Sequence, residues 1–213
     1  MNRYKIFMKH AAKKATAALR LLFLPALLLS TAMNAQAAEE TPAEAENIVA
    51  EAPAETISVT MVGDSVMLGA APSIQEALPD CVIDAKVSRQ ITQADDVLDS
   101  LEQQNTLHQT VVIALGTNGP FGTDVGQELI DRLGNDRTVY WVTVYGSELS
   151  WQEDSNTTIR ELADANENVH IIDWAQTASG HTEWFYSDGI HLNAEGREAY
   201  TQMVLTALSP GQT

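Results

Sequence analysis

Residues 57–70 read ISVTMVGDSVMLGA, and this stretch decides the fold. Residues 57–62 form a continuous apolar run of strand length, which is typical of a strand that is buried on both faces of a sheet. Gly63 and Asp64 interrupt the run, and helical spacing begins at about residue 66. The stretch therefore predicts a buried strand, a tight turn and a covering helix.

The same alternation continues through the rest of the chain. Further strands are predicted at 81–87, 110–115, 138–144 and 168–174, and helices at 66–78, 92–104, 123–134, 154–165 and 194–208. This pattern predicts an α/β fold, namely a three-layer α/β/α, flavodoxin-like sandwich with a mainly parallel five-stranded sheet. Ligands of such folds bind beyond the carboxyl ends of the strands, so the residues that directly follow strands are candidates for a site.

The first 37 residues have the pattern of an export signal. Six basic residues precede an apolar run at 21–29, and Ala35-Gln36-Ala37 supplies the small residues that a signal peptidase requires. An uncleaved membrane anchor is the alternative, but a spanning helix needs about 20 apolar residues, and this shorter run contains Pro25. We therefore expect residues 1–37 to be a signal peptide and the protein to act extracytoplasmically, secreted or in the cell envelope.

Two further segments follow the predicted signal. Residues 38–56 are mostly Ala, Glu, Pro and Thr, and they have too few large apolar side chains to offset the entropy of ordering. They are interpreted as a disordered acidic linker. Residues 57–213 have the length of one domain with one sizeable core.

The charge of the chain excludes some partners. Residues 1–37 contain six of the 12 Lys and Arg and none of the 29 Asp and Glu, so the remainder has a formal net charge of −23. Such a surface repels phosphate backbones and anionic lipids, so we expect no nucleic acid partner. The single Cys81 cannot form an internal disulfide, and the absence of CxxC and HExxH motifs indicates no metal site and no cofactor.

Ser65 directly follows the first predicted strand. A serine on a tight turn from strand to helix lies where backbone N–H groups face developing negative charge, which is where a nucleophile is expected. Alternatively, Asp64 or Ser65 only caps the helix, since both residue types are common at that position. The motif therefore needs partners elsewhere in the chain.

Two later segments offer those partners. Asn118, in the Gly-Thr-Asn-Gly turn after the third strand, can donate an N–H to an oxyanion, although the same four residues also make an ordinary turn. His191 can accept the proton of a serine, and Asp188, three residues earlier, can orient its imidazole. A solvated aspartate and a surface histidine are the alternative. The placement of all three segments at one edge of one sheet favours a catalytic triad of Ser65, Asp188 and His191.

The residues that carry these motifs resemble the SGNH hydrolases, also called GDSL-like esterases. The segments GDSVMLGA, DAKVSRQ, VVIALGTNG, IIDW and DGIHLNAEG are similar to the extracellular domain of peptidoglycan O-acetyltransferases. The resemblance covers residues 57–208. It implies that Ser65 is the nucleophile, His191 the base and acid, and Asp188 its orienting partner. It also implies an oxyanion hole formed by Asn118 and the N–H groups of Ser65 and Ser88.

The chain departs from the wider family at two positions. Ser88 stands where the family has a glycine; its N–H is retained, but its side chain can narrow the pocket or require a backbone conformation that glycine adopts more easily. Gly119 stands where many members have aspartate, as is usual in the O-acetyltransferase branch. The resemblance implies an acyl-enzyme whose acyl group passes to water, as in an acetylesterase, or to a glycan hydroxyl, as in an O-acetyltransferase. The substrate is then an acylated glycan or a small ester, and a separate membrane acyltransferase would supply the acyl group.

Two questions stay open from the sequence. A noncatalytic glycan-binding or envelope scaffold protein on the same fold is the alternative function, and Ser88 is the feature that favours it. Five aromatic residues are candidates for a sugar-stacking surface: Trp151, Trp174, Trp184, Phe185 and Tyr186. Packing in the core or in loops is the alternative explanation for all five, and for Trp174 it is the better one.

Overall fold

The computed structural model describes residues 57–209, and the predicted signal peptide and linker lie outside this range. Five parallel strands form one sheet in the order β2-β1-β3-β4-β5. Their bounds are β1 Val59–Gly63, β2 Val82–Ala85, β3 Thr110–Ala114, β4 Thr138–Val142 and β5 Val169–Ile172. The middle strand β3 is continuously apolar and buried over four of its five residues, because helices cover both of its faces.

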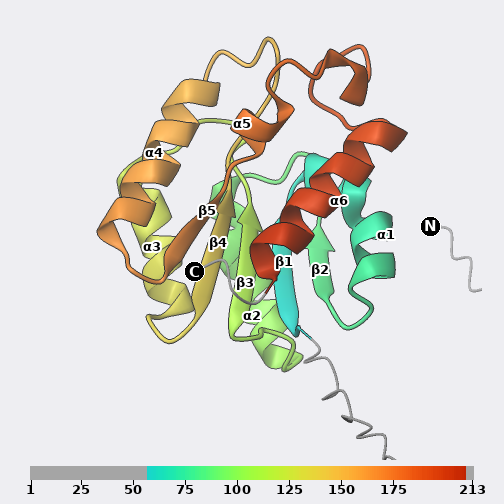
Figure 1. The fold of residues 1–213 in the computed structure, drawn as a ribbon. Helices are drawn as coiled ribbons and strands as arrows, with labels where there is room; N and C mark the ends of the chain where they lie inside the picture. The colour runs from blue at the N-terminus through green and yellow to red at the C-terminus, as the bar shows by residue number, and fades with distance from the viewer. Residues whose placement is uncertain (1–56, 210–213) are drawn as a thin grey trace, which may run out of the picture. The chain divides into compact units, whose positions relative to one another are not determined.

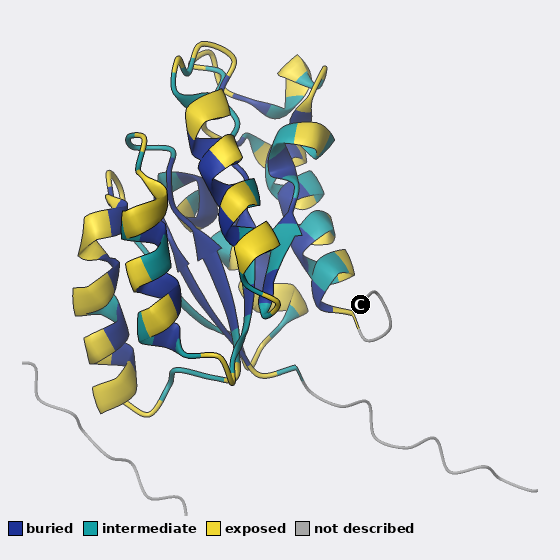
Figure 2. Cartoon of the chain, turned by 90° about the vertical axis from the view of Figure 1, so that its left-hand side faces the viewer, coloured by how far each residue is buried: buried dark blue, intermediate teal, exposed yellow. Residues whose placement is uncertain are grey.

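Helices form the two outer layers (Figure 1). Their bounds are α1 Ser65–Ala77, α2 Ala94–Gln103, α3 Thr123–Leu133, α4 Gln152–Ala165, α5 Trp174–Ala178 and α6 Ala194–Leu208, with 3-10 turns η1 Ile91–Gln93 and η2 Thr182–Trp184. Helices α1, α5 and α6 pack on one face of the sheet, whereas α2, α3 and α4 pack on the other. Figure 2 shows the result, with buried strands between helices whose outer surfaces are exposed. The three-layer α/β/α fold predicted from the sequence is confirmed.

Several local predictions differ from the structure, mostly at the ends of elements. The last predicted strand ends at Ile172, and Trp174 instead begins α5, because Asp173 caps that helix by accepting a hydrogen bond from the N–H of Gln176. The short elements α5 and η2 were not predicted, since each is too short for helical periodicity to show. Helix α4 begins two residues earlier than predicted.

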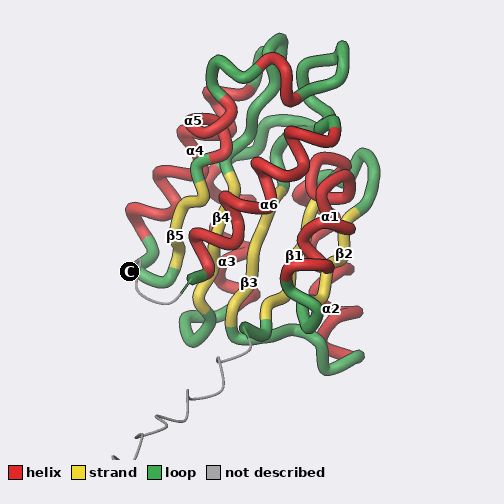
Figure 3. The backbone as a smooth tube through the Cα atoms, turned by 45° about the vertical axis from the view of Figure 1, so that its right-hand side comes forward, coloured by secondary structure: helices red, strands yellow, loops and turns green. Residues whose placement is uncertain are grey.

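The loops that follow the strands gather at one end of the sheet (Figure 3). All five strands are parallel, so their carboxyl ends share this edge. The segments that carry Ser65, Ser88 and Asn118 follow β1, β2 and β3 there. Among residues 57–209, no helix is both long and apolar enough to cross a membrane.

Candidate active site

Ser65 is the first residue of α1, and Asp64 holds it there. The Asp64 carboxylate accepts a hydrogen bond of 2.9 Å from the N–H of Val66, which caps the helix. The N–H of Asp64 donates to the carbonyl of Ala114 on β3, so the turn is anchored to the sheet on its other side. Ser65 therefore stands half-buried on the first turn of a helix, where backbone N–H groups have no intrahelical acceptor.

Gly63 is required here for space. Its φ does not lie in the left-handed region, so backbone conformation is not the reason for a glycine here. A Cβ at this position would lie 2.5 Å from the sulfur of Met67, because α1 folds back closely over the end of β1. Glycine thus allows the tight turn that presents Ser65 at the edge of the sheet.

Burial affects the acid beside the nucleophile. Asp64 is 1% exposed, and desolvation raises the pKa of its carboxyl group above the ordinary value, although the hydrogen bond from Val66 opposes the shift. Tyr200, buried on α6, has its pKa raised by burial and by the nearby charge of Asp64. Asp64 is therefore a structural cap under the nucleophile and is not exposed for reaction with a substrate.

His191 and Asp188 approach Ser65 from the loop before α6, residues 187–193, which we call the triad loop. The Nε2 atom of His191 lies 2.9 Å from the Oγ atom of Ser65, and its Nδ1 atom lies 2.8 Å from the Oδ2 atom of Asp188. The other carboxylate oxygen of Asp188 accepts hydrogen bonds of 2.9 Å from the N–H groups of Ile190 and His191. The structure thus brings the three predicted triad residues into one hydrogen-bonded chain.

The charge state of Asp188 determines the direction of these hydrogen bonds. Partial desolvation would raise its pKa, but hydrogen bonds from the N–H groups of His191 and Ile190 and from the imidazole outweigh it and lower the pKa to about 2. An ionised carboxylate only accepts hydrogen bonds, so Nδ1 of His191 carries the proton. Nε2 is then free to accept the hydroxyl hydrogen of Ser65, as a general base requires.

Ser88 lies in the loop after β2 and adopts a left-handed conformation. Its φ is +59°, and it is exposed. This conformation is the one that glycine adopts without cost, whereas other residues are disfavoured there by about 1–2 kcal/mol. The sequence raised the question whether a serine can replace the family's glycine at this position. Ser88 does adopt the backbone conformation typical of glycine, at the cost of backbone strain.

Asn118 is tied to the same loop. Its side-chain amide donates a hydrogen bond of 3.3 Å to the backbone carbonyl of Arg89. The backbone carbonyl of Asn118 accepts one of 2.7 Å from the side-chain amide of Gln90. A side-chain amide has two N–H groups, so one remains available. The loops after β2 and β3, which carry both predicted oxyanion donors, are thus joined. Gly119 at the end of this turn has a φ of +149°.

Arg89 is a residue of this site that the sequence reasoning missed. It is 5% exposed, and its guanidinium donates 3.0 Å to the carbonyl of Gly63 and also binds the carboxylate and carbonyl of Asp84. It therefore fixes the Ser88 loop to the last residue of β1, directly before the nucleophile turn. The signal in the sequence was an arginine next to Ser88 in a strongly acidic chain.

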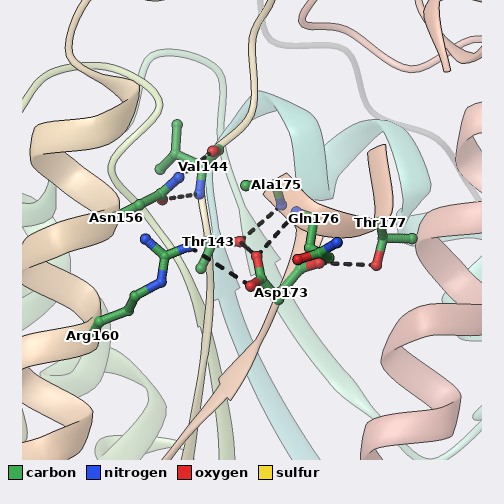
Figure 4. A network of polar contacts seen from close by, with 8 residues as sticks. All are labelled: Thr143, Val144, Asn156, Arg160, Asp173, Ala175, Gln176 and Thr177. Atoms are coloured by element: carbon green, nitrogen blue, oxygen red, sulfur yellow. Dashed lines mark hydrogen bonds and ion pairs between the residues drawn. The ribbon is translucent and has the colours of Figure 1, made fainter. Parts of the chain in front are cut away.

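A second polar network fixes the carboxyl ends of β4 and β5 (Figure 4). Asn156, buried on α4, accepts a hydrogen bond from the N–H of Val144 at 2.7 Å and donates one to its carbonyl at 2.8 Å. The Thr143 hydroxyl donates to the Asp173 carboxylate at 2.8 Å and accepts from the N–H of Ala175. These bonds determine where the loop after β4 leaves the sheet.

The aromatic candidates separate into different environments. Trp174 is 2% exposed and packs against Trp184 and Tyr200 in the core, so it is excluded as a sugar-stacking residue. Trp184 stacks on His181, with the ring centroids 3.7 Å apart. Tyr186, next to the triad loop, is 53% exposed. Trp151, half-buried, lies directly before α4, and Phe185 is buried.

Cys81 is buried, and burial raises the pKa of its thiol. Among residues 57–209, no group of three or more His, Cys, Asp or Glu side chains is arranged to hold a metal ion.

Comparisons with known proteins identify relatives of this chain. It is 34% identical over 165 residues to the peptidoglycan O-acetyltransferase OatA of Listeria monocytogenes, and 34% identical over 157 residues to the O-acetyltransferase OatA of Staphylococcus aureus. These matches cover 77% and 73% of this chain, and in each case 26% of the relative. The chain thus spans about a quarter of the length of these curated relatives. No family model matches it.

A solved structure covers the same region. The C-terminal catalytic domain of the peptidoglycan O-acetyltransferase OatA of Streptococcus pneumoniae superimposes with a TM-score of 0.65 at 30% identity, over 71% of this chain and 92% of that domain. The match therefore includes nearly the whole of a separately solved catalytic domain. By this likeness, and with the fold described above, the chain belongs to the SGNH (GDSL-like) hydrolase family, in the group that contains the catalytic domains of peptidoglycan O-acetyltransferases.

Proposed function

We propose that this protein is a serine-dependent acyl-transfer enzyme that acts outside the cytoplasm on O-acetyl esters of cell-envelope glycan. Ser65, His191 and Asp188 form its triad. The observation that carries the proposal is the unbroken chain from Ser65 Oγ to His191 Nε2 at 2.9 Å and from His191 Nδ1 to Asp188 at 2.8 Å. Membership of the family gives the enzyme class, an SGNH-type acyltransferase or esterase.

In the first step, Ser65 Oγ attacks the carbonyl carbon of an acetyl ester while its proton passes to Nε2 of His191. The oxyanion accepts hydrogen bonds from the N–H groups of Ser65 and Ser88 and from the amide of Asn118. The bond to the leaving oxygen then breaks, and that oxygen takes the proton from His191. The product is an acetyl ester on Ser65.

In the second step, a hydroxyl group replaces the serine. It gives its proton to Nε2 of His191, and its oxygen attacks the acetyl carbon, so that Ser65 leaves and regains a proton. Water as the acceptor makes the enzyme an acetylesterase, and a sugar hydroxyl makes it an O-acetyltransferase. Asp188 keeps the imidazole in one tautomer and stabilises the imidazolium in both steps.

The glycan substrate and the location are supported by the relatives and by residues 1–56. The relatives are named as peptidoglycan O-acetyltransferases, which act on a cell-wall polymer. The signal-peptide pattern of residues 1–37 and the acidic segment 38–56 agree with export. We further propose that a membrane acyltransferase partner supplies the acyl group, as the resemblance to the peptidoglycan O-acetyltransferases implies.

The test is turnover of p-nitrophenyl acetate by the purified protein, with Ser65→Ala as the variant. Ser73→Ala is the matched control, because Ser73 lies on the same helix two turns beyond the site. We expect Ser65→Ala to lose at least about 10³-fold of the turnover and Ser73→Ala to keep it. Intact-mass measurement after a short reaction should show one added acetyl group on the parent and on Ser73→Ala, and none on Ser65→Ala.

Equal turnover by the parent and by Ser65→Ala would reject the triad. The protein would then be better explained as a noncatalytic glycan-binding or scaffold protein on the same fold, and retention on insoluble glycan would be the next measurement.

A further inference from the structure

A cleft of about 300 Å³ opens next to the triad loop. One wall is the loop after β4, with Tyr145 and Ser147, and the other is the segment that leads to Asp188. The two walls are joined, because the N–H of Ser147 donates to the carbonyl of Gly189 at 3.1 Å. The cleft therefore lies at the carboxyl edge of the sheet, and residues on both sides of Asp188 in the sequence line it.

The lining of the cleft combines aromatic rings with hydroxyl groups. Three aromatic rings line it, together with the hydroxyl groups of two serines and a threonine: Tyr145, Phe185, Tyr186, Ser147, Ser187 and Thr182. None of the lining residues is charged. Glu148 and Glu183, which adjoin two of them in the sequence, are exposed acids. An anionic ligand would therefore be repelled, and a long acyl chain would leave three hydroxyl groups without partners.

Tyr186 offers an exposed ring in a fixed position. The residue is 53% exposed, its hydroxyl accepts a hydrogen bond of 3.3 Å from the guanidinium of Arg197, and its N–H donates to the carbonyl of His191 at 2.8 Å. Deeper in the cleft, Tyr145 and Phe185 stack with their centroids 5.0 Å apart. Tyr186 is thus fixed both by Arg197 and by its backbone hydrogen bond to the triad histidine.

We propose that this cleft binds a pyranose ring of the acceptor glycan, which rests on the proposed function. The C–H face of a sugar ring carries weak positive charge and packs against the negative face of an aromatic ring, while its hydroxyl groups bond to serine and threonine. A pyranose ring is uncharged, and it offers C–H groups to the aromatic rings and hydroxyl groups to the serines and the threonine of the lining. A sugar bound there, beside the loop that carries Asp188, then competes with water for acetyl-Ser65.

The experiment measures how the acetyl-enzyme divides between its two acceptors. The purified protein receives p-nitrophenyl acetate with increasing chitopentaose, and mass spectrometry and acetate release give the ratio of acetylated sugar to free acetate. Both products come from one intermediate, so a defect in the first step lowers both and leaves the ratio unchanged. The ratio therefore reports on acceptor binding and separates it from the proposed chemistry.

Tyr186→Ala removes the exposed ring, and we expect the ratio to fall about tenfold, the effect of losing one good aromatic contact. Tyr186→Phe keeps the ring and should stay within about twofold of the parent, because only the hydroxyl is lost. His170→Ala is the control, since His170 lines a different cleft formed by β4, β5 and the ends of α4 and α6. Its ratio should equal that of the parent.

A ratio that is the same for Tyr186→Ala and the parent would overturn the sugar site while leaving the acyl-transfer chemistry intact. So would a parent that releases acetate by way of Ser65, transfers none to chitopentaose and is not inhibited by it. Absence of any Ser65-dependent release would instead reject the proposed function itself.

Discussion

The strained backbone of Ser88 makes a prediction for Ser88→Gly that can be worked from the structure. Ser88 has a φ of +59° and an exposed side chain, so the change removes strain and little packing. Relief of the left-handed conformation is worth about 1–2 kcal/mol. Glycine also makes the unfolded chain more flexible, which costs about 0.4–1 kcal/mol. The net expectation is a free energy of unfolding higher by up to about 1.5 kcal/mol, which corresponds to a Tm higher by up to about 3–6 °C.

The activity of Ser88→Gly should stay within about twofold of the parent, because the proposed oxyanion contact uses the backbone N–H, which glycine retains. Ser88→Val tests the opposite direction. A β-branched residue is strongly disfavoured at positive φ, so the domain should lose stability and the loop should move. Turnover of p-nitrophenyl acetate should then fall by as much as about 10²-fold, the effect of losing one oxyanion donor.

Asn105→Gly is the matched control. Asn105 has a φ of +57° but lies between α2 and β3, at the opposite edge of the sheet from Ser65. Its gain in stability should be smaller, since asparagine tolerates this conformation better than serine, and its turnover should not change. Thermal unfolding and steady-state kinetics of the three variants give both quantities. A Tm that falls in Ser88→Gly, or turnover that falls tenfold with the fold intact, would refute the reasoning.

Three further predictions concern other parts of the fold and site. Asn156→Ala leaves both backbone groups at the end of β4 without partners and should lower the free energy of unfolding in urea by about 2–4 kcal/mol, whereas the exposed neighbour Thr157→Ala should change it by less than about 0.5 kcal/mol. Asp188→Asn turns a donor toward Nδ1 of His191 and should lower turnover about 10⁴-fold with an unchanged Tm at pH 7; a loss below tenfold would contradict the assigned tautomer. Arg89→Ala should lower kcat more than it raises KM, since it releases the Ser88 loop, and Arg89→Lys should restore part of kcat; equal loss in both variants with a collapsed Tm would indicate a purely structural role.

The low pKa of Asp188 also makes the stability of the fold depend on pH. Its folded value of about 2 is below the ordinary 3.8, so the carboxylate stabilises the fold above pH 3.8, and this contribution is lost as the pH falls through 2. The contribution is small, because the side chain is 48% exposed and solvent screens it. Carboxylate chemical shifts measured by NMR between pH 1.5 and 5 should give the low pKa in the parent.

The alternation of apolar runs and helical spacing determined the architecture from the sequence alone. A strand buried on both faces must be continuously apolar, and a covering helix must repeat its apolar face every three to four residues. These are local patterns, so the five strands and the long helices could be placed, with ends displaced by a few residues. The segments GDS and DGIH could be recognised for the same reason, since each is a short run with a defined place relative to a strand or helix.

Features that depend on distant contacts were decided only by the tertiary structure. Four features are of this kind: the strand order, the burial of Trp174 between helices, the left-handed conformation of Ser88 and the hydrogen bond from Arg89 to Gly63. Each depends on contacts between segments that are far apart in the sequence. The 2.9 Å contact between Ser65 and His191 spans 126 positions. No local pattern fixes such a distance, because it results from how helices on the sheet pack, whereas the residue types that meet there were already present in the sequence.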